Sequence, residues 1–280
     1  MNVISSPLIS CAELMSLRDS HSVFILDASI KPVAGFNAPK QQWPTCVIKG
    51  AIRFDIDNTF SNHSAAIPHT MPEPEQFQLS VRNLGIDNES LVVVYDSYGL
   101  FSAARAWWML KSMGVKHIAV LDGGLPAWIQ SGGETEAATE SHISDSRFVA
   151  QFQEKMFVDK QQVLDNFNST DVAILDARSA DRFYGRVAEP REGLRSGHIP
   201  NAQNVPFNSL LKSNGLMKST DELAQLLLPL VNNKNEVITS CGSGVTACVI
   251  SLALAIVGVE SCVYDGSWSE WGADNHLPIE

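Results

Sequence analysis

The sequence predicts an α/β protein in which helices flank mainly parallel sheets, built from two similar halves. Short runs of β-type residues alternate with helical patterns along the chain, which is typical of parallel strands joined by crossover helices. Four segments of the first half recur in the second half in the same order and at similar spacing. With 280 residues and 45% hydrophobic content, the chain is long enough for two domains of ordinary size.

Three apolar runs bounded by turn residues predict central strands of the first half. They are SVFILDA at 22–28, SLVVVYD at 90–96 and HIAVLDGG at 117–124. Two helical patterns among them end at Gly85 and Gly114, where a left-handed residue often closes a helix. The apolar stretch from Val245 to Val259 is too short to span a membrane and predicts a buried helix.

The repeated segments predict a duplicated domain. VAILDARSADRF matches VFILDASIKP, HIPNAQNVPF matches VIKGAIRFDI, NEVITSCGSGVTACVISLAL matches ESLVVVYDSYGLFSAARAWWML, and SCVYDGSWSEW matches IAVLDGGLPAW. The polar stretch 132–157 lacks sustained periodicity, which favours a linker there, and we set it at 141–157. We therefore expect a first domain over 1–140 and a second over 158–280.

Composition and charge exclude several classes of function. The net charge of −11 opposes non-specific binding to nucleic acid or to an anionic membrane surface. The five cysteines include no CxxC pair, so neither a disulfide framework nor a metal site is expected. The N-terminal segment has no basic start and no long apolar run, which argues against a secretory signal. We expect a cytoplasmic protein with reduced thiols.

A candidate nucleophile follows a predicted strand of the second half. The segment SCGSGVTAC places Cys241 after the run EVIT and before a helix expected to begin near Val245. Backbone N–H groups and the helix dipole favour an anion at such a turn, so this thiol should ionise readily. Gly242 and Gly244 let the backbone curl under the sulfur without a Cβ in the way. The first half has Asp96 at this position, so only the second copy can hold a thiol nucleophile.

Two other interpretations of this loop are weaker. A structural cysteine in a glycine turn is the ordinary case, but the strand, the glycines, the helix start and the duplicated neighbour agree on a nucleophile. A cysteine-dependent phosphatase needs an arginine that closes the loop around phosphate. Here Ala247 stands six residues after Cys241, and no basic residue follows before the helix ends, so phosphate hydrolysis is disfavoured.

Four segments together carry a resemblance to a known family. They are CGSGVTA at 241–247, DARSADRFYGRVAEPREGLRSGHIPNAQNVPF at 176–207, FDIDNTFSNHSAAIPHTMP at 54–72 and YDGSWSEWG at 264–272. Over nearly its whole length the chain resembles the two-domain rhodanese family, in its 3-mercaptopyruvate sulfurtransferase branch. The resemblance implies two tandem rhodanese-like domains and an enzyme without cofactor or metal. Cys241 would take sulfur from a small-molecule donor as a persulfide, release pyruvate, and pass the sulfur to a thiol, to cyanide or to thioredoxin.

The resemblance also assigns residues that bind the donor. Arg182 and Arg191 match two arginines that hold the carboxylate and the ketone oxygen of the substrate, and a guanidinium suits a planar carboxylate. The alternative is that both arginines form surface ion pairs with Glu189 or Glu192. The loop residues implied in substrate binding are Gly242, Gly244, Val245 and Thr246.

A proton relay is the third feature that the resemblance implies. Asp57, His69 and Ser243 match a triad that would carry a proton to the departing pyruvate enolate. His63 lies close to His69 in the sequence, so the assignment of the histidine is ambiguous. A calcium loop over DIDNTFSNHS is rejected, because positions six and twelve lack the required glycine and glutamate.

Several other residues near these motifs are expected to be structural. Asp176 would end a strand, and Ser219 with Glu222 would cap a helix. His198 would form a hydrogen bond with the backbone, and Cys248 would be buried and inert. Arg186 and Arg195 would be solvated. Residues 265–268 would form a wall of the pocket, although Trp268 and Trp271 fit a core position equally well.

Two functions besides mercaptopyruvate chemistry stay open. The same thiolate is suited to transfer sulfur from thiosulfate to cyanide, and a comparison of the two donors would separate these activities. A non-catalytic interaction module is the other alternative, because rhodanese-like domains are often reused for binding. A gain of one sulfur at Cys241 after donor treatment would favour the enzyme.

Overall fold

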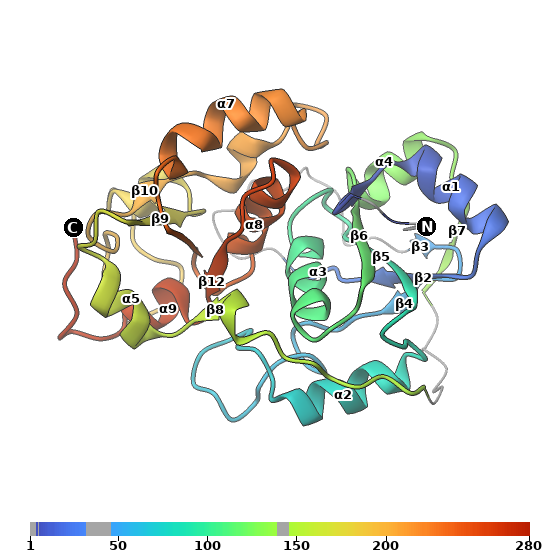
Figure 1. Ribbon diagram of the computed structural model, residues 1–280, viewed down its shortest axis with the longest axis horizontal. Helices are drawn as coiled ribbons and strands as arrows, with labels where there is room; N and C mark the ends of the chain where they lie inside the picture. Colours follow the sequence, from blue (N-terminus) through green and yellow to red (C-terminus); the bar gives the residue numbers. More distant parts are fainter. Residues whose placement is uncertain (1–3, 5, 32–45, 139–145) are drawn as a thin grey trace.

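The computed structural model describes residues 4, 6–31, 46–138 and 146–280, and it contains two parallel five-stranded sheets flanked by helices (Figure 1). The strand order is β1-β6-β5-β2-β4 in the first sheet and β10-β9-β11-β12-β8 in the second. Every strand pairing within these two sheets is parallel. The predicted α/β class is confirmed.

The first sheet belongs to the first half of the chain. Its strands are β1 (Leu8–Ile9), β2 (Val23–Asp27), β4 (Ile52–Arg53), β5 (Leu91–Tyr95) and β6 (His117–Leu121). The helices are α1 (Cys11–Ser20), α2 (Pro74–Asn83), α3 (Ala103–Ser112) and α4 (Gly124–Gln130), and β3 (Cys46–Ile48) pairs antiparallel with β7 (Thr135–Ala137). The three predicted strands are confirmed as β2, β5 and β6. Gly85 and Gly114 follow α2 and α3 with φ values of 77° and 98°, as predicted.

The second sheet belongs to the second half. Its strands are β8 (Phe157–Val158), β9 (Val172–Asp176), β10 (Gln203–Asn204), β11 (Glu236–Ser240) and β12 (Cys262–Tyr264). The helices are α5 (Lys160–Asn166), α6 (Ala180–Phe183), α7 (Thr220–Val231), α8 (Ala247–Ile256) and α9 (Ser267–Trp271), with 3-10 turns η1 (Glu154–Met156) and η2 (Phe207–Leu210). Ser219 and Glu222 form the predicted capping box of α7. Helix α8 is buried along most of its length, as its apolar sequence predicts.

The two sheets repeat one strand order. Strands β1, β6, β5, β2 and β4 correspond in place and in chain order to β8, β12, β11, β9 and β10. Asp96 directly follows β5 and Cys241 directly follows β11, so these two residues lie at equivalent points. In open parallel sheets, the carboxyl ends of the central strands are where ligands usually bind.

The segment that joins the halves lies partly outside the described residues. The expected boundary between 140 and 141 falls in the stretch 139–145, which the structure does not describe. Phe157, the expected last residue of the linker, is the first residue of β8 and pairs with Val263. The expected linker therefore overlaps the second sheet by one residue.

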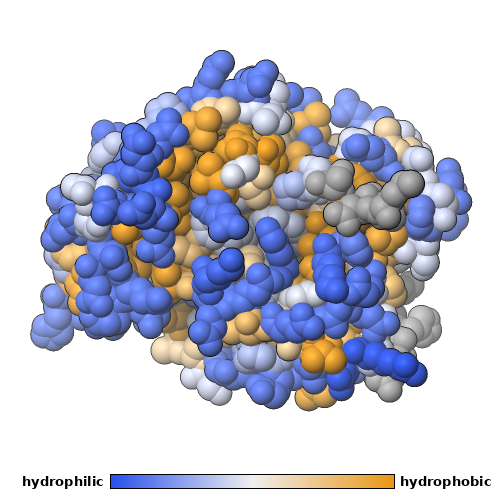
Figure 2. All heavy atoms as spheres, in the orientation of Figure 1, coloured by the Kyte–Doolittle hydropathy of each residue, from blue (hydrophilic) through white to orange (hydrophobic). Residues whose placement is uncertain are grey.

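The two halves share one apolar core. Helices α3 and α8 pack against each other (Figure 1), and the buried cluster between them includes Ala104 and Trp107 of α3 together with Val249 and Leu252 of α8. Figure 2 shows polar residues over most of the visible face, with apolar residues gathered over α8. No helix in the described part of the chain is long and apolar enough to cross a membrane. Because the shared core fixes the halves together, side chains of the first reach the loop after β11.

Candidate active site

Cys241 is the first residue after β11, and residues 241–246 form the loop that leads into α8. The helix begins at Ala247, two residues later than the sequence predicts. The cysteine is 2% exposed and lines a cavity of about 210 Å³. Gly242, Ser243, Val245 and Thr246 line the same cavity.

The loop holds backbone N–H donors that are unused within the described part of the chain. The amides of Ser243, Val245 and Thr246 have no hydrogen-bond acceptor among the described residues. Gly244 adopts a φ of 75°, and a Cβ there would lie 3.0 Å from the carbonyl oxygen of Asp265. Gly244 therefore shapes the turn and does not line the cavity, unlike the other four loop residues after Cys241.

Ser267 holds the loop in place through hydrogen bonds on the side away from the cavity. Its φ of 50° is uncommon for a residue with a side chain, and it is fully buried. The hydroxyl accepts hydrogen bonds from the amides of Cys241 at 3.2 Å and Gly244 at 3.1 Å, and donates to the carbonyl of Tyr264 at 2.8 Å. Residues 265–268 thus lie behind the loop, and the expectation that they wall the cavity is wrong. Trp268 belongs to the apolar core instead.

Asp57, His69 and Ser243 are in direct contact across the interface between the halves. Nδ1 of His69 lies 3.1 Å from Oγ of Ser243, and Nε2 of His69 lies 3.0 Å from Oδ1 of Asp57. The hydrogen bond to His69 holds the pKa of Asp57 below its usual value. The geometry therefore selects His69 over His63.

Arg105 is a residue of this site that the sequence analysis missed. It comes from α3, its side chain is fully buried, and Nη2 donates to the carbonyl of His69 at 2.8 Å and to Oδ1 of Asp265 at 2.6 Å. The other carboxylate oxygen of Asp265 accepts the amide of Met71 at 2.8 Å. This ion pair fixes the segment around His69, whose φ is 63°, against the second half. The one available signal was an arginine inside the apolar helix sequence AARAWWML.

The two predicted donor-binding arginines differ in their partners. Arg182 donates to both carboxylate oxygens of Glu189, at 3.2 and 2.6 Å, which is one of the ion pairs considered as an alternative. Arg191 forms no ion pair with a described residue and donates to the hydroxyls of Ser269 at 3.1 Å and Ser243 at 3.4 Å. Burial lowers the pKa of Arg191. Both arginines line the cavity next to Cys241. The cavity therefore contains one cation, Arg191, that has no carboxylate partner among the described residues.

A buried charge network supports Arg182. Glu189 also accepts from Arg178 at 3.0 Å, and Arg178 donates in turn to Asp176 at 2.8 Å. The Arg178 guanidinium lies 4.3 Å from the ring centre of Trp268. The sequence suggested Glu189 only as a surface ion-pair partner of the arginines. In the structure its side chain is 1% exposed and orients two arginines, Arg178 and Arg182.

The remaining structural expectations have mixed outcomes. His198 contacts the carbonyl of Phe183 through Nδ1 at 3.0 Å, and Arg186 is exposed, both as predicted. Cys248 is buried as predicted, and burial raises its pKa to about 12. Arg195 is not solvated: it is half-buried and donates to four backbone carbonyls of the C-terminal segment, those of Trp271, Gly272, Asp274 and Leu277.

The fold and the loop define the class of protein. The family model described as "Rhodanese-like domain" matches residues 10–131 and again residues 159–274. The chain belongs to the rhodanese family, with two copies of its domain.

The chain is also similar over most of its length to individual members of this family. It is 40% identical to the 3-mercaptopyruvate sulfurtransferase of Escherichia coli K12, over 94% of this chain and 93% of that protein. It is 36% identical to the mitochondrial thiosulfate/3-mercaptopyruvate sulfurtransferase 1 of Arabidopsis thaliana, over 99% of this chain and 78% of that protein. The crystal structure of SseA from Escherichia coli superposes with a TM-score of 0.81 at 36% identity, covering 94% of this chain and 99% of that one.

Proposed function

We propose that the chain is a 3-mercaptopyruvate sulfurtransferase in which Cys241 carries the sulfur. The observation that supports this best is the charge of the cavity. Arg191 lies beside the nucleophile loop, and its hydrogen-bond partners among the described residues are hydroxyls, so it could take a substrate carboxylate without giving up an ion pair. Each charge-assisted hydrogen bond to that carboxylate is worth about 1.5–3 kcal/mol.

The two arginines would divide the work of binding the donor. Arg191 would take the carboxylate, because no carboxylate among the described residues is paired with it. Arg182 would take the ketone oxygen, because Glu189 already accepts from two of its nitrogens and leaves less charge for an anion. Removing Arg191 should therefore weaken donor binding more than removing Arg182.

The first half-reaction follows from this placement. The Cys241 thiolate attacks the sulfur of mercaptopyruvate, a sulfur–sulfur bond forms, and the carbon–sulfur bond breaks with its electron pair left on the pyruvate enolate. A proton passes from the donor thiol to the enolate carbon, and pyruvate leaves. Ser243 and His69, in contact at 3.1 Å, would carry this proton, while Asp57 orients the imidazole.

The persulfide on Cys241 would be held as an anion. The amides of Ser243, Val245 and Thr246 are unused donors at the start of α8, where the helix dipole also favours negative charge. An acceptor thiolate then takes the outer sulfur and restores the Cys241 thiolate, so the two half-reactions predict ping-pong kinetics. Thiols, cyanide and thioredoxin are the proposed acceptors.

The two copies of the domain would have different tasks. We propose a first domain at 1–140 and a second at 158–280, with the linker between them reaching one residue into β8. The first copy lacks a thiol after its central strand and would act by supplying Asp57, His69 and Arg105 to the second. The five cysteines are free of disulfides, which fits a reducing compartment, and we propose the cytoplasm.

Thiosulfate is the second candidate donor. The Arabidopsis relative is named for both thiosulfate and 3-mercaptopyruvate, and it aligns with nearly the whole of this chain. The loop CGSGVTA carries no basic residue, which leaves less positive charge for the dianionic thiosulfate.

A side-by-side assay tests the proposal. Pyruvate release from 3-mercaptopyruvate with a panel of acceptor thiols is compared with thiocyanate formation from thiosulfate and cyanide. We expect kcat/KM to be higher for mercaptopyruvate. A higher value for thiosulfate would reverse the order of donors, and no turnover with either would favour the interaction module.

A further inference from the structure

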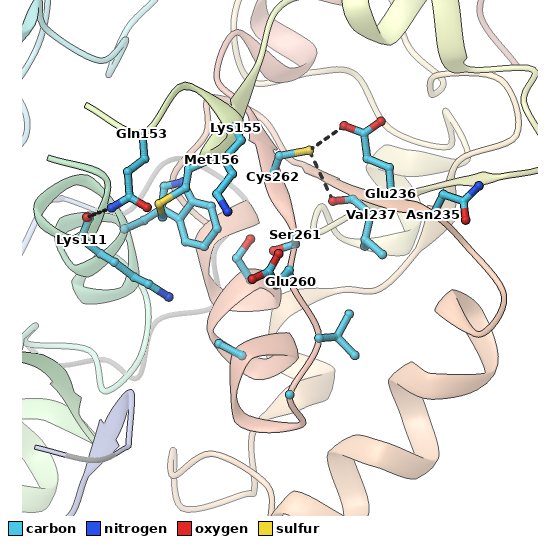
Figure 3. A pocket seen from close by; sticks show the side chains of 15 residues that line it. Lys111, Gln153, Lys155, Met156, Asn235, Glu236, Val237, Glu260, Ser261 and Cys262 are labelled. Carbon is cyan, nitrogen blue, oxygen red and sulfur yellow. Dashed lines mark hydrogen bonds between the residues drawn. The ribbon is translucent and has the colours of Figure 1, made fainter. Parts of the chain in front are cut away.

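A second cavity lies between the two halves at the end of the sheet opposite to Cys241 (Figure 3). It encloses about 450 Å³, and none of its lining residues lines the cavity of the nucleophile. Its walls come from α3, from residues 153–156, from the start of β11 and from the turn between α8 and β12. Glu236 begins β11 and lines this cavity, whereas Cys241 follows the other end of that strand.

Four charged residues around this cavity have no ion-pair partners. Lys111 and Lys155 come from α3 and η1, and Glu236 and Glu260 come from the second half. None of the four forms an ion pair with a described residue. In Figure 3 the lysines lie on the side of α3 and the connecting segment, and Glu236 lies across from Lys111. Both signs of charge are therefore available to a ligand.

Two buried donors on the cavity wall also lack partners. Nε1 of Trp108 and Oγ of Ser261 are enclosed and make no hydrogen bond with any described residue. The Trp108 residue is 3% exposed. Both atoms are closed off even from water, so the charged side chains are the polar groups that a ligand in the cavity would meet.

The cavity has two positive and two negative side chains, and this restricts the kind of ligand that fits it. Two lysines attract an anion, but Glu236 and Glu260 line the same cavity and repel it, and the charge of Glu260 acts on Lys111, so a simple anion such as phosphate gains little. Lys111 is held with Nζ 4.9 Å from the ring centre of Trp107, and burial lowers the pKa of this lysine. A molecule that carries one carboxylate and one ammonium satisfies both walls. Val237, Val259 and Met156 add apolar surface.

We propose that this cavity binds a small zwitterion, namely a free α-amino acid with an apolar side chain or a short peptide of such residues. The carboxylate lies toward Lys111 and Lys155 and the ammonium toward Glu260 and Glu236. The apolar side chain packs on the valines. This site is separate from the proposed sulfur transfer. Because its walls belong to both halves, the ligand stabilises their association.

Calorimetric titration and thermal unfolding of the full chain test the proposal. The probes are L-leucine and glycyl-leucine, with 4-methylpentanoate and 3-methylbutylamine as analogues of leucine that lack the ammonium or the carboxylate. We expect saturable binding and a rise in Tm with at least one zwitterion, and roughly tenfold weaker binding of both analogues. Absence of binding by both zwitterions, or equal binding by an analogue, would overturn the proposal.

Variants locate the binding. Lys111→Met and Glu260→Gln should each weaken binding of the zwitterion roughly tenfold, the loss of one charge-assisted contact. Lys212→Met is the matched control, an exposed lysine outside the cavity, and should leave binding unchanged. Pyruvate release should be unchanged in Lys111→Met, which separates this site from sulfur transfer. Equal loss in the control, or unchanged binding in both cavity variants, would contradict the placement.

Discussion

The loops that follow β5 and β11 occupy equivalent places in two copies of one fold. In the part of the chain that the structure describes, only the loop after β5 has a side-chain carboxyl group bound to its backbone amides. In the first half, the carboxylate of Asp96 accepts the amides of Tyr98, Phe101, Ser102 and Ala103, at 2.8, 2.8, 2.9 and 2.9 Å. Burial raises the pKa of Asp96, and the four amide donors oppose that effect, so the loop closes around a carboxyl group that is part of the chain.

In the second loop the amides have no such acceptor, and we propose that they stabilise the negative charge of the Cys241 thiolate and persulfide. Cys241 stands where Asp96 stands in the first half, and the amides of Ser243, Val245 and Thr246 have no acceptor among the described residues. A cavity of about 210 Å³ lies beside the sulfur. The same turn directs backbone donors at one point in both halves, and a different residue stands at that point, Asp96 in the first half and Cys241 in the second.

The largest expected effect is the loss of turnover in Cys241→Ser. A hydroxyl at this site is a far weaker nucleophile than a thiolate, so pyruvate release should fall to the background rate. Steady-state pyruvate release measures this. Cys248→Ser is the control, because that thiol is buried behind the loop, and it should retain most of the activity. Comparable losses in both variants would contradict the assignment of the nucleophile.

Replacement of His69 should have the next largest effect. His69→Ala removes the group that contacts Ser243 and Asp57, and kcat should fall roughly 10²–10⁴-fold, with a smaller change in KM. The matched control is His63→Ala, which should leave kcat unchanged. Equal kinetics in the two variants would show that the interface contact does not carry the proton.

Loss of Arg191 should act mainly on donor binding. Arg191→Ala should raise KM for mercaptopyruvate about 10–100-fold, from the loss of charge-assisted hydrogen bonds. Arg182→Ala should have a smaller effect because Glu189 shares its charge. Arg186→Ala, at an exposed site, is the control. A pure fall in kcat with unchanged KM would argue against binding of the carboxylate by Arg191.

The loop after β5, where Asp96 binds four backbone amides, should contribute to the stability of the protein. Asp96→Ala leaves four amides without their acceptor, and it should lower the free energy of unfolding by roughly 3 kcal/mol or more. Cys241→Ala should cost less, because that side chain accepts from none of the loop amides. Denaturant unfolding followed by tryptophan fluorescence measures both. If the two substitutions cost the same, the difference between the loops is not one of anion binding.

The smallest expected effect concerns pH. The hydrogen bond to His69 lowers the pKa of Asp57 in the folded protein, so the ionised form contributes stability above the ordinary aspartate pKa. That contribution is lost as pH falls through the lowered pKa. The Tm difference between the parent protein and Asp57→Asn should therefore be present at neutral pH and vanish in acid. A difference independent of pH would contradict this coupling.

The sequence predicts best what is local or repeated. The central strands and the glycines that close α2 and α3 depend on neighbouring residues, and the repeated segments imply the shared strand order. Cys241 and its loop lie within one short motif, so the proposed nucleophile could be identified from the sequence alone. The helix start differed by two residues because small and hydroxyl residues allow either a turn or a helix there.

Contacts between distant residues could not be predicted from the pattern of the sequence. Arg105 and Asp265 are 160 residues apart, and their pairing depends on how α3 packs against the second half. Burial of Glu189 and the four carbonyl contacts of Arg195 likewise depend on where distant loops meet. The contact of His69 with Ser243 was expected only from the family resemblance, because His63 lies close to His69 in the sequence and left the assignment of the histidine ambiguous.

The position of the transferred sulfur decides whether Cys241 is the sulfur carrier. The protein is treated with 3-mercaptopyruvate without an acceptor, and mass spectrometry of the intact chain and of its peptides follows. The account predicts a gain of one sulfur atom, confined to the peptide with Cys241, lost on addition of a thiol and absent in Cys241→Ser. No gain, or a gain at another cysteine, would contradict it.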